Sequence, residues 1–133
     1  MEFKSFDVLL KAFELDLQEK AINQTNPAGF AHAESLVADG KVITPGQWNH
    51  PTAAEENDYL QANGYAEFSK WYLGIDTAMD KETKGHYGYV YTSDFKTVDR
   101  EGLIAIRKRA AQHHQDKIFA EAGKLIDKID AKK

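Results

Sequence analysis

Residues 99–131 read DREGLIAIRKRAAQHHQDKIFAEAGKLIDKIDA, and this stretch decides the fold. In its first half, apolar residues recur at helical spacing: Leu103, Ile106 and Ala110. After a break near residues 114–116 the same spacing returns: Ile118, Ala122, Leu125 and Ile129. Thr97 or Asp99 is placed to cap the first of these helices. Two amphipathic helices joined by a short break predict an antiparallel helical hairpin.

Upstream of this hairpin, capping signals predict more short helices. Asn26-Pro27 combines a capping side chain with proline at the first helical position, and Gly40 suits the left-handed residue after the helix ends. Thr52 and Glu55 form a capping box that starts a third helix, which stops near Gly64. An amphipathic pattern predicts a helix over residues 5–21, a brief helix is expected within 65–73, and residues 41–51 are expected to form a loop.

Residues 85–92, GHYGYVYT, alternate with a period of two and predict a short extended segment. The sequence therefore predicts a mainly α domain of five or six short helices with one small extended element near residues 85–92. The alternative is an α+β domain with a two- or three-stranded sheet. The predicted core consists of Phe6, Leu10, Phe13, Leu17, Trp71, Leu103, Ile106, Ile118, Leu125 and Ile129.

Length and composition limit the class of protein. The 133 residues, 42% of them hydrophobic, fit a single domain spanning residues 1–133. The chain has no cysteine, which excludes disulfides and thiolate chemistry, and no apolar run long enough to cross a bilayer. The N-terminus shows no signal-peptide pattern, so we expect a soluble cytoplasmic protein without membrane contact.

Charge is divided unevenly along the chain. The net charge is −4, and it combines a balance of −6 in residues 1–66 with +2 in residues 67–133. A net negative chain does not have the uniformly basic surface typical of nucleic-acid-binding domains.

No motif indicates catalysis, a metal or a cofactor. The five histidines lack the spacing of zinc ligands, since the one close pair, His113-His114, points in two directions on a helix. The acidic loop that starts at Asp76 fails the calcium-binding register at its glycine and its last position. The four residues 85–88 match the GxxG of a KH domain but precede an extended segment instead of joining two helices. We therefore predict a protein that is not an enzyme and has no cofactor and no metal site.

One set of residues combines aromatic rings with cations and is the candidate interaction surface: Tyr87, Tyr89, Tyr91, Arg100, Arg107, Lys108 and Arg109. Such residues stack bases and neutralise phosphates, and they also anchor protein interfaces. Composition favours internal packing first, a protein interface second and nucleic acid third. In the packing interpretation the three tyrosines lie on one side against the helix at residues 99–114, in one cluster with Trp71. An open stacking platform requires the same rings to be exposed.

The second half of the chain also resembles a family of small uncharacterised bacterial proteins. The similarity rests on an ordered series: KWYLGID at 70–76, KGHY at 84–87, DF at 94–95, VDREGL at 98–103 and RAAQ at 109–112. It covers about residues 53–130, and its C-terminal part is similar to segments of phage and prophage proteins. The chain departs from the pattern at Val90, where the family has proline, at one extra residue in Thr92-Ser93, and at Asp99, which replaces a histidine.

The resemblance implies a compact domain and supplies no mechanism, because the family has no established activity. From the residues and the resemblance together we expect a non-enzymatic interaction or accessory domain, phage-related or bacterial, that binds a protein partner or a second copy of itself. The alternative is a nucleic-acid-binding module that uses the tyrosine–arginine surface.

Overall fold

The computed structural model describes residues 17–44 and 46–132. These residues form four named helices: α2 (Pro27–Ala38), α3 (Ala53–Phe68), α4 (Arg100–Gln112) and α5 (Asp116–Ala131). One antiparallel sheet has the order β1 (Gln24–Thr25), β3 (Tyr72–Ile75) and β4 (Tyr87–Val90). A second, parallel pair joins β2 (Val42–Ile43) to β5 (Val98–Asp99). The fold is rich in helix, as predicted, and the small sheet of the alternative is also present.

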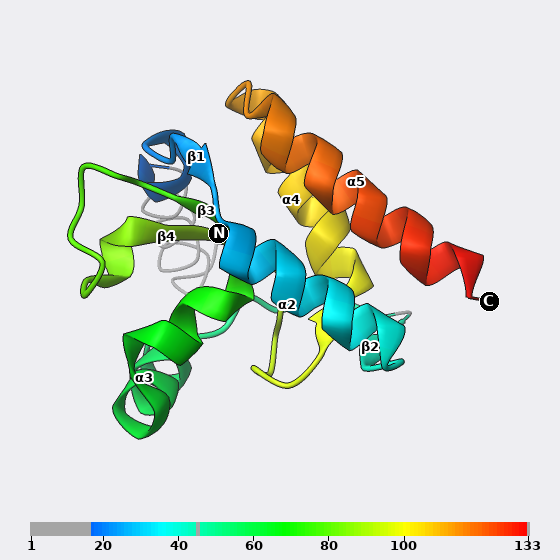
Figure 1. The fold of residues 1–133 in the computed structure, drawn as a ribbon, viewed down its shortest axis with the longest axis horizontal. Coiled ribbons are helices and arrows are strands. Elements are labelled where there is room, and N and C mark those ends of the chain that lie inside the picture. Colours follow the sequence, from blue (N-terminus) through cyan, green and yellow to red (C-terminus); the bar gives the residue numbers. More distant parts are fainter. Residues whose placement is uncertain (1–16, 45, 133) are drawn as a thin grey trace, which may run out of the picture.

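Figure 1 shows α4 and α5 lying along one another on one side, the three-stranded sheet on the other side, and α2 between them. Contacts between α2 and both α5 and β3 hold this arrangement together. The predicted helical hairpin is confirmed, and Asp99 is its cap: the carboxylate accepts from the backbone N–H of Glu101 at 3.0 Å and of Gly102 at 3.2 Å. His114 turns the chain between the two helices with a φ of 57°.

Helix α2 begins where Asn26-Pro27 predicts, but the role predicted for the Asn26 side chain is wrong. Asn26 makes no capping hydrogen bond. Its amide instead donates to the backbone oxygens of Ser69, at 2.7 Å, and Tyr72, at 2.9 Å. The amide of Asn26 therefore joins α2 to the start of β3, because it donates to two backbone carbonyls at that point.

The capping box of α3 is present in both directions, with Thr52 and Glu55 each binding the backbone N–H of the other. The helix is interrupted at Gly64, where φ is 82°, and residues 65–68 form a further helical turn. The helix expected within 65–73 is only partly correct, since a 3₁₀ turn at Ser69–Trp71 leads into strand β3. The loop expected at 41–51 contains strand β2.

The predicted core is largely confirmed among the described residues. Six of its members are buried: Trp71, Leu103, Ile106, Ile118, Leu125 and Ile129. Leu17 is wrong, since 51% of its surface is exposed. Phe6, Leu10 and Phe13, with most of the helix predicted at 5–21, lie outside the described residues, and residues 17–20 are helical.

Candidate interaction surface

The three tyrosines of the predicted interaction surface are buried. Tyr87 is 5% exposed, and neither Tyr89 nor Tyr91 has measurable exposure. The Tyr91 ring lies 5.7 Å from that of Trp71, and its hydroxyl donates to the backbone oxygen of Lys70 at 2.6 Å. Burial raises the pKa of Tyr91, so the hydroxyl stays protonated. The predicted contact with Trp71 is confirmed for Tyr91, and none of the three rings offers an open face on which bases could stack.

The prediction that all three rings lie on one side is wrong, and Tyr89 is the reason. Its φ is 64°, a left-handed conformation that tyrosine rarely adopts and that breaks the alternation of the strand. A Cβ atom built on Gly74 would lie 2.9 Å from Ile118 Cδ1 and 3.1 Å from a ring carbon of Tyr89. Tyr89 therefore packs toward α5, whereas the ring of Tyr87 packs against Phe68, 5.9 Å away.

The four cations of the predicted surface point to different neighbours. Arg100 makes a bidentate ion pair with Asp130 of α5, in which its Nε and Nη2 donate to the two carboxylate oxygens at 2.9 and 2.8 Å. Arg109 turns inward to the buried carboxylate of Glu19. Arg107 and Lys108 form no ion pair with any carboxylate of the described residues. The seven predicted residues therefore do not form one surface. Within the described residues, Arg107 and Lys108 are the two cations of this set that have no ion pair.

Arg107 and Lys108 line a groove of about 350 Å³ on the α4–α5 hairpin, together with Ile104, Ala111 and Phe119. We call these five residues the hairpin groove. The Arg107 guanidinium carbon lies 4.1 Å above the centre of the Phe119 ring, a favourable cation–π contact. Its Nε is buried and has no hydrogen-bond partner within the described part of the chain. The groove therefore combines an apolar floor with two cations that have no ion pair within the described residues.

Ile104 and Phe119 were not among the predicted site residues, although the sequence contains a signal for them. Each follows directly after a core residue, Leu103 or Ile118, and so falls beside the apolar stripe of its helix. An apolar residue beside the stripe widens the face beyond what the core covers. Both side chains are only partly buried and pack at the edge of the core.

The ion pair of Glu19 and Arg109 is the second feature that the sequence did not reveal, because its members are far apart in the chain. Glu19 is fully buried, and it also accepts the backbone N–H of Tyr89 at 3.2 Å. Burial raises the pKa of Glu19, although Arg109, the Tyr89 N–H and the nearby His113 all act to lower it. The pair joins residues 17–20 to β4 and α4, and so serves the fold.

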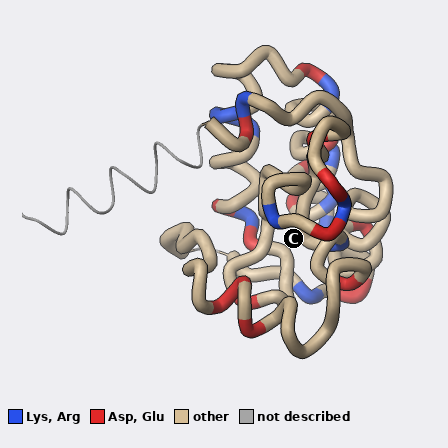
Figure 2. The backbone as a smooth tube through the Cα atoms, turned by 90° about the vertical axis from the view of Figure 1, so that its left-hand side faces the viewer, with Lys and Arg blue, Asp and Glu red and all other residues tan. Residues whose placement is uncertain are grey.

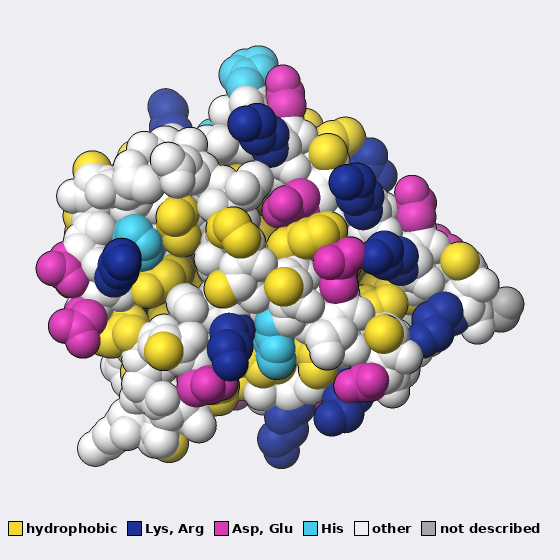
Figure 3. Space-filling view, in the orientation of Figure 1, with side chains coloured by type: hydrophobic (Ala, Val, Ile, Leu, Met, Phe, Trp, Pro, Cys, Tyr) yellow, Lys and Arg dark blue, Asp and Glu magenta, His cyan; other side chains and the backbone are white. Residues whose placement is uncertain are grey.

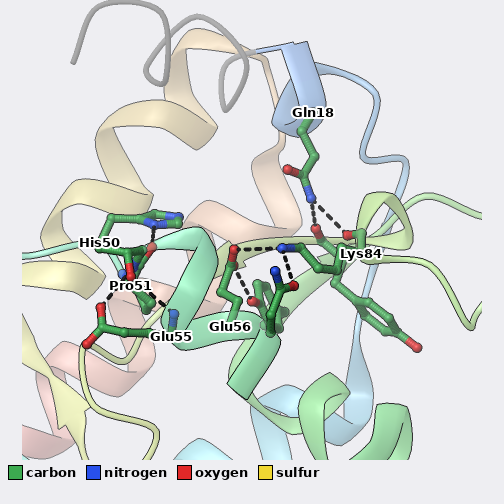
Figure 4. A network of polar contacts seen from close by, with 10 residues as sticks. Gln18, His50, Pro51, Glu55, Glu56 and Lys84 are labelled. Atoms are coloured by element: carbon green, nitrogen blue, oxygen red, sulfur yellow. Dashed lines mark hydrogen bonds and ion pairs between the residues drawn. The ribbon is translucent and has the colours of Figure 1, made fainter. Parts of the chain in front are cut away.

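Figure 4 shows a third polar network, at the edge of strand β4. The Gln18 amide donates to the backbone oxygen of Lys84 at 3.1 Å and to that of Tyr87. Lys84 lies 3.5 Å from the buried carboxylate of Glu56, which accepts the Tyr72 hydroxyl at 2.9 Å. Burial, followed by the nearby Glu56, raises the pKa of Tyr72 well above its usual value, so this hydroxyl remains a donor. The network ties α3 to the β3–β4 hairpin.

The surface shows small apolar patches among charges. Figure 3 shows hydrophobic side chains over α2 and toward α5, separated by charged and polar groups, and Figure 2 shows acidic and basic residues interspersed along the chain. Among the described residues, no cluster of three or more histidine, aspartate or glutamate side chains could hold a metal ion, and no helix is long and apolar enough to span a membrane. Comparisons with protein families, curated proteins and solved structures found no match for this chain.

Proposed function

We propose that this chain is a non-enzymatic protein-interaction domain and that the hairpin groove is its docking surface. The observation that carries the proposal is the pair of cations that line this groove, Arg107 and Lys108, which form no ion pair with any carboxylate of the described residues. Charge-assisted hydrogen bonds between arginine and a carboxylate are among the stronger ones in proteins. An incoming carboxylate would pair with these cations while the apolar floor takes an apolar side chain.

The chemistry of the groove defines the partner. Arginine and aromatic side chains dominate the binding energy of protein interfaces, and Arg107 already rests on Phe119. Lys108 is exposed beside it and adds a second positive charge. The expected partner is a protein segment that presents an apolar side chain next to aspartate or glutamate. The family resemblance, a phage-related origin and a cytoplasmic location remain predictions.

The burial of the tyrosines weighs against the nucleic-acid alternative. Single-strand binding proteins combine a basic groove with exposed aromatic rings. Here the rings are buried, and of the four predicted cations two are held in ion pairs. What remains for phosphates is a pair of charges beside an apolar floor.

A charge-neutral variant tests the proposal. Arg107→Met with Lys108→Met keeps the aliphatic stems and removes both charges, and Lys81→Met with Lys117→Met removes the same charge at two exposed positions outside the groove. We expect a partner captured by the wild-type chain to be retained by the control and lost by the groove variant. Circular dichroism verifies that both variants fold.

Salt dependence distinguishes the two classes of partner. Phosphate binding weakens steeply between about 50 and 200 mM salt, whereas an interface with an apolar floor changes little. A partner that both variants capture equally would overturn the assignment of the groove. Loss of a captured nucleic acid from the groove variant, with a steep salt dependence, would establish the alternative.

A further inference from the structure

A second groove lies between helix α3 and the loop at residues 93–96, away from the hairpin groove. Its volume is about 450 Å³, and its lining includes Tyr59, Phe95 and the acidic residues Glu55, Asp58 and Asp94. We call it the α3 groove. The rings of Tyr59 and Phe95 are stacked, with centroids 4.5 Å apart and planes inclined by 15°. Both rings are only partly buried, so the stacked pair is accessible from the groove.

The two rings are held in place by their surroundings. The Tyr59 hydroxyl accepts the indole N–H of Trp71 at 3.0 Å. Phe95 has a φ of 54°, and its backbone N–H donates to the fully buried hydroxyl of Thr92 at 3.0 Å. A ligand that settles on these rings therefore meets a preformed surface, which lowers the entropy cost of binding.

Among the described residues that line this groove, carboxylates outnumber cations, and Lys96 is the one basic residue. Burial acts to raise the pKa of Asp94, but hydrogen bonds from Lys96 N–H, Thr97 and Thr92 outweigh it and lower the pKa. Asp94 is therefore ionised at neutral pH. Asp58 is exposed, and no hydrogen bond or ion pair to another described residue engages it.

We infer that the α3 groove docks an arginine side chain from a basic segment of a partner protein. A guanidinium group is planar, stacks on aromatic faces and pairs with carboxylates through two donors, so it matches both the ring pair and the acids. An ammonium group lacks the planar face, and a neutral group lacks the attraction to the acids. This site is separate from the hairpin groove in position and opposite to it in charge.

The test uses three peptides of one length: acetyl-GRGRG-amide, the same peptide with citrulline for arginine, and the same peptide with lysine. Citrulline keeps the shape of arginine and removes its charge. Titration followed by amide chemical shifts should give saturable changes around residues 58–62 and 93–96 with the arginine peptide. Lysine should bind more weakly and citrulline should not bind. No saturable change, or equal binding of any two peptides, would overturn the inference.

A matched pair of variants tests the contribution of the acids. Glu55→Gln with Asp58→Asn removes two charges and keeps the capping box, because glutamine also serves at that position. Each exposed ion pair contributes up to about 1 kcal/mol, so we expect the arginine peptide to bind about fivefold more weakly or worse. Asp80→Asn with Asp127→Asn, at exposed positions outside the groove, should change nothing. If the groove variant and the control variant weaken peptide binding equally, the effect comes from the net charge of the protein, and the assignment of the α3 groove is wrong. The methionine variant of the hairpin groove should bind the peptide normally, which separates this test from that of the proposed function.

Discussion

Replacing Gly29 by alanine tests the closest approach in the fold. Gly29 lies in α2 where the helix meets the start of strand β3. A Cβ atom at this position would lie 1.8 Å from the backbone oxygen of Tyr72 and 2.8 Å from its carbonyl carbon. Carbon and oxygen atoms in contact need roughly 3.3 Å or more. Helix and strand must therefore separate by roughly 1.5 Å.

The cost follows from what this separation breaks. Asn26 donates three hydrogen bonds across the same contact, from its backbone to Leu73 and from its amide to Ser69 and Tyr72. Overpacking costs about 1–3 kcal/mol, and each buried polar group left without a partner costs about 1–3 kcal/mol more. Alanine returns at most about 1 kcal/mol through its higher helix propensity. We expect a net loss of about 2–5 kcal/mol in the free energy of unfolding.

Urea denaturation followed by circular dichroism measures this loss, and Gly123→Ala is the matched control. Gly123 lies in α5, and a Cβ atom there would have Arg107 as its nearest neighbour at an ordinary 3.6 Å. The control should gain about 0.5–1 kcal/mol in its free energy of unfolding. The same glycine-to-alanine change should therefore stabilise the protein in α5 and destabilise it in α2. If Gly29→Ala changes stability by less than about 0.5 kcal/mol, the packing of α2 on β3 is not as described.

Two further predictions concern buried groups. Tyr89→Ala should lower the free energy of unfolding by about 3–5 kcal/mol, because it empties a fully buried site. A variant that melted like the wild type but lost binding to single-stranded nucleic acid would show instead that Tyr89 stacks on bases. Because the pKa of Glu19 is raised in the folded state, the unfolded chain releases this proton first, and the contribution of Glu19 to stability falls as the pH rises above its ordinary pKa. Between pH 4 and 8, the stability of Glu19→Gln should therefore improve relative to the wild type, and a shift in favour of the wild type would mean that Arg109 outweighs burial.

Local signals made most of the helices predictable. A proline at the first helical position, a capping box and a left-handed glycine each act within a few residues, and the structure places them as expected at Pro27, Thr52 and Gly40. Strand pairing depends on partners far away in the sequence, and β1, β2 and β5 are two residues long. No periodicity can emerge from two residues, so these strands were missed. Strand β3 is divided between an expected helix, which includes Tyr72 and Leu73, and an expected turn that starts at Gly74, because a short apolar run fits a helix or a strand equally well.

The candidate site was harder to predict because the direction of each side chain depends on the tertiary fold. The left-handed backbone of Tyr89 sends its ring to the other side of the strand, and the sequence GYVY contains no sign of this turn. Arg107, Lys108 and Arg109 are consecutive, so a helix sends them in directions about 100° apart. Arg107 rests on the ring of Phe119 and Lys108 faces solvent. Arg109 pairs with the carboxylate of Glu19.

The distribution of the aromatic rings bears directly on the class of partner. The tyrosines on which the nucleic-acid alternative depends pack inside the molecule, where rings of α3, β3 and β4 contact one another. At the surface of the hairpin lie two cations, Arg107 and Lys108, beside an apolar floor of Ile104, Ala111 and Phe119. A nucleic-acid backbone satisfies the cations and leaves the floor in water. A protein segment satisfies both, because it presents carboxylates and apolar side chains side by side, and this difference favours a protein as the partner of the hairpin groove.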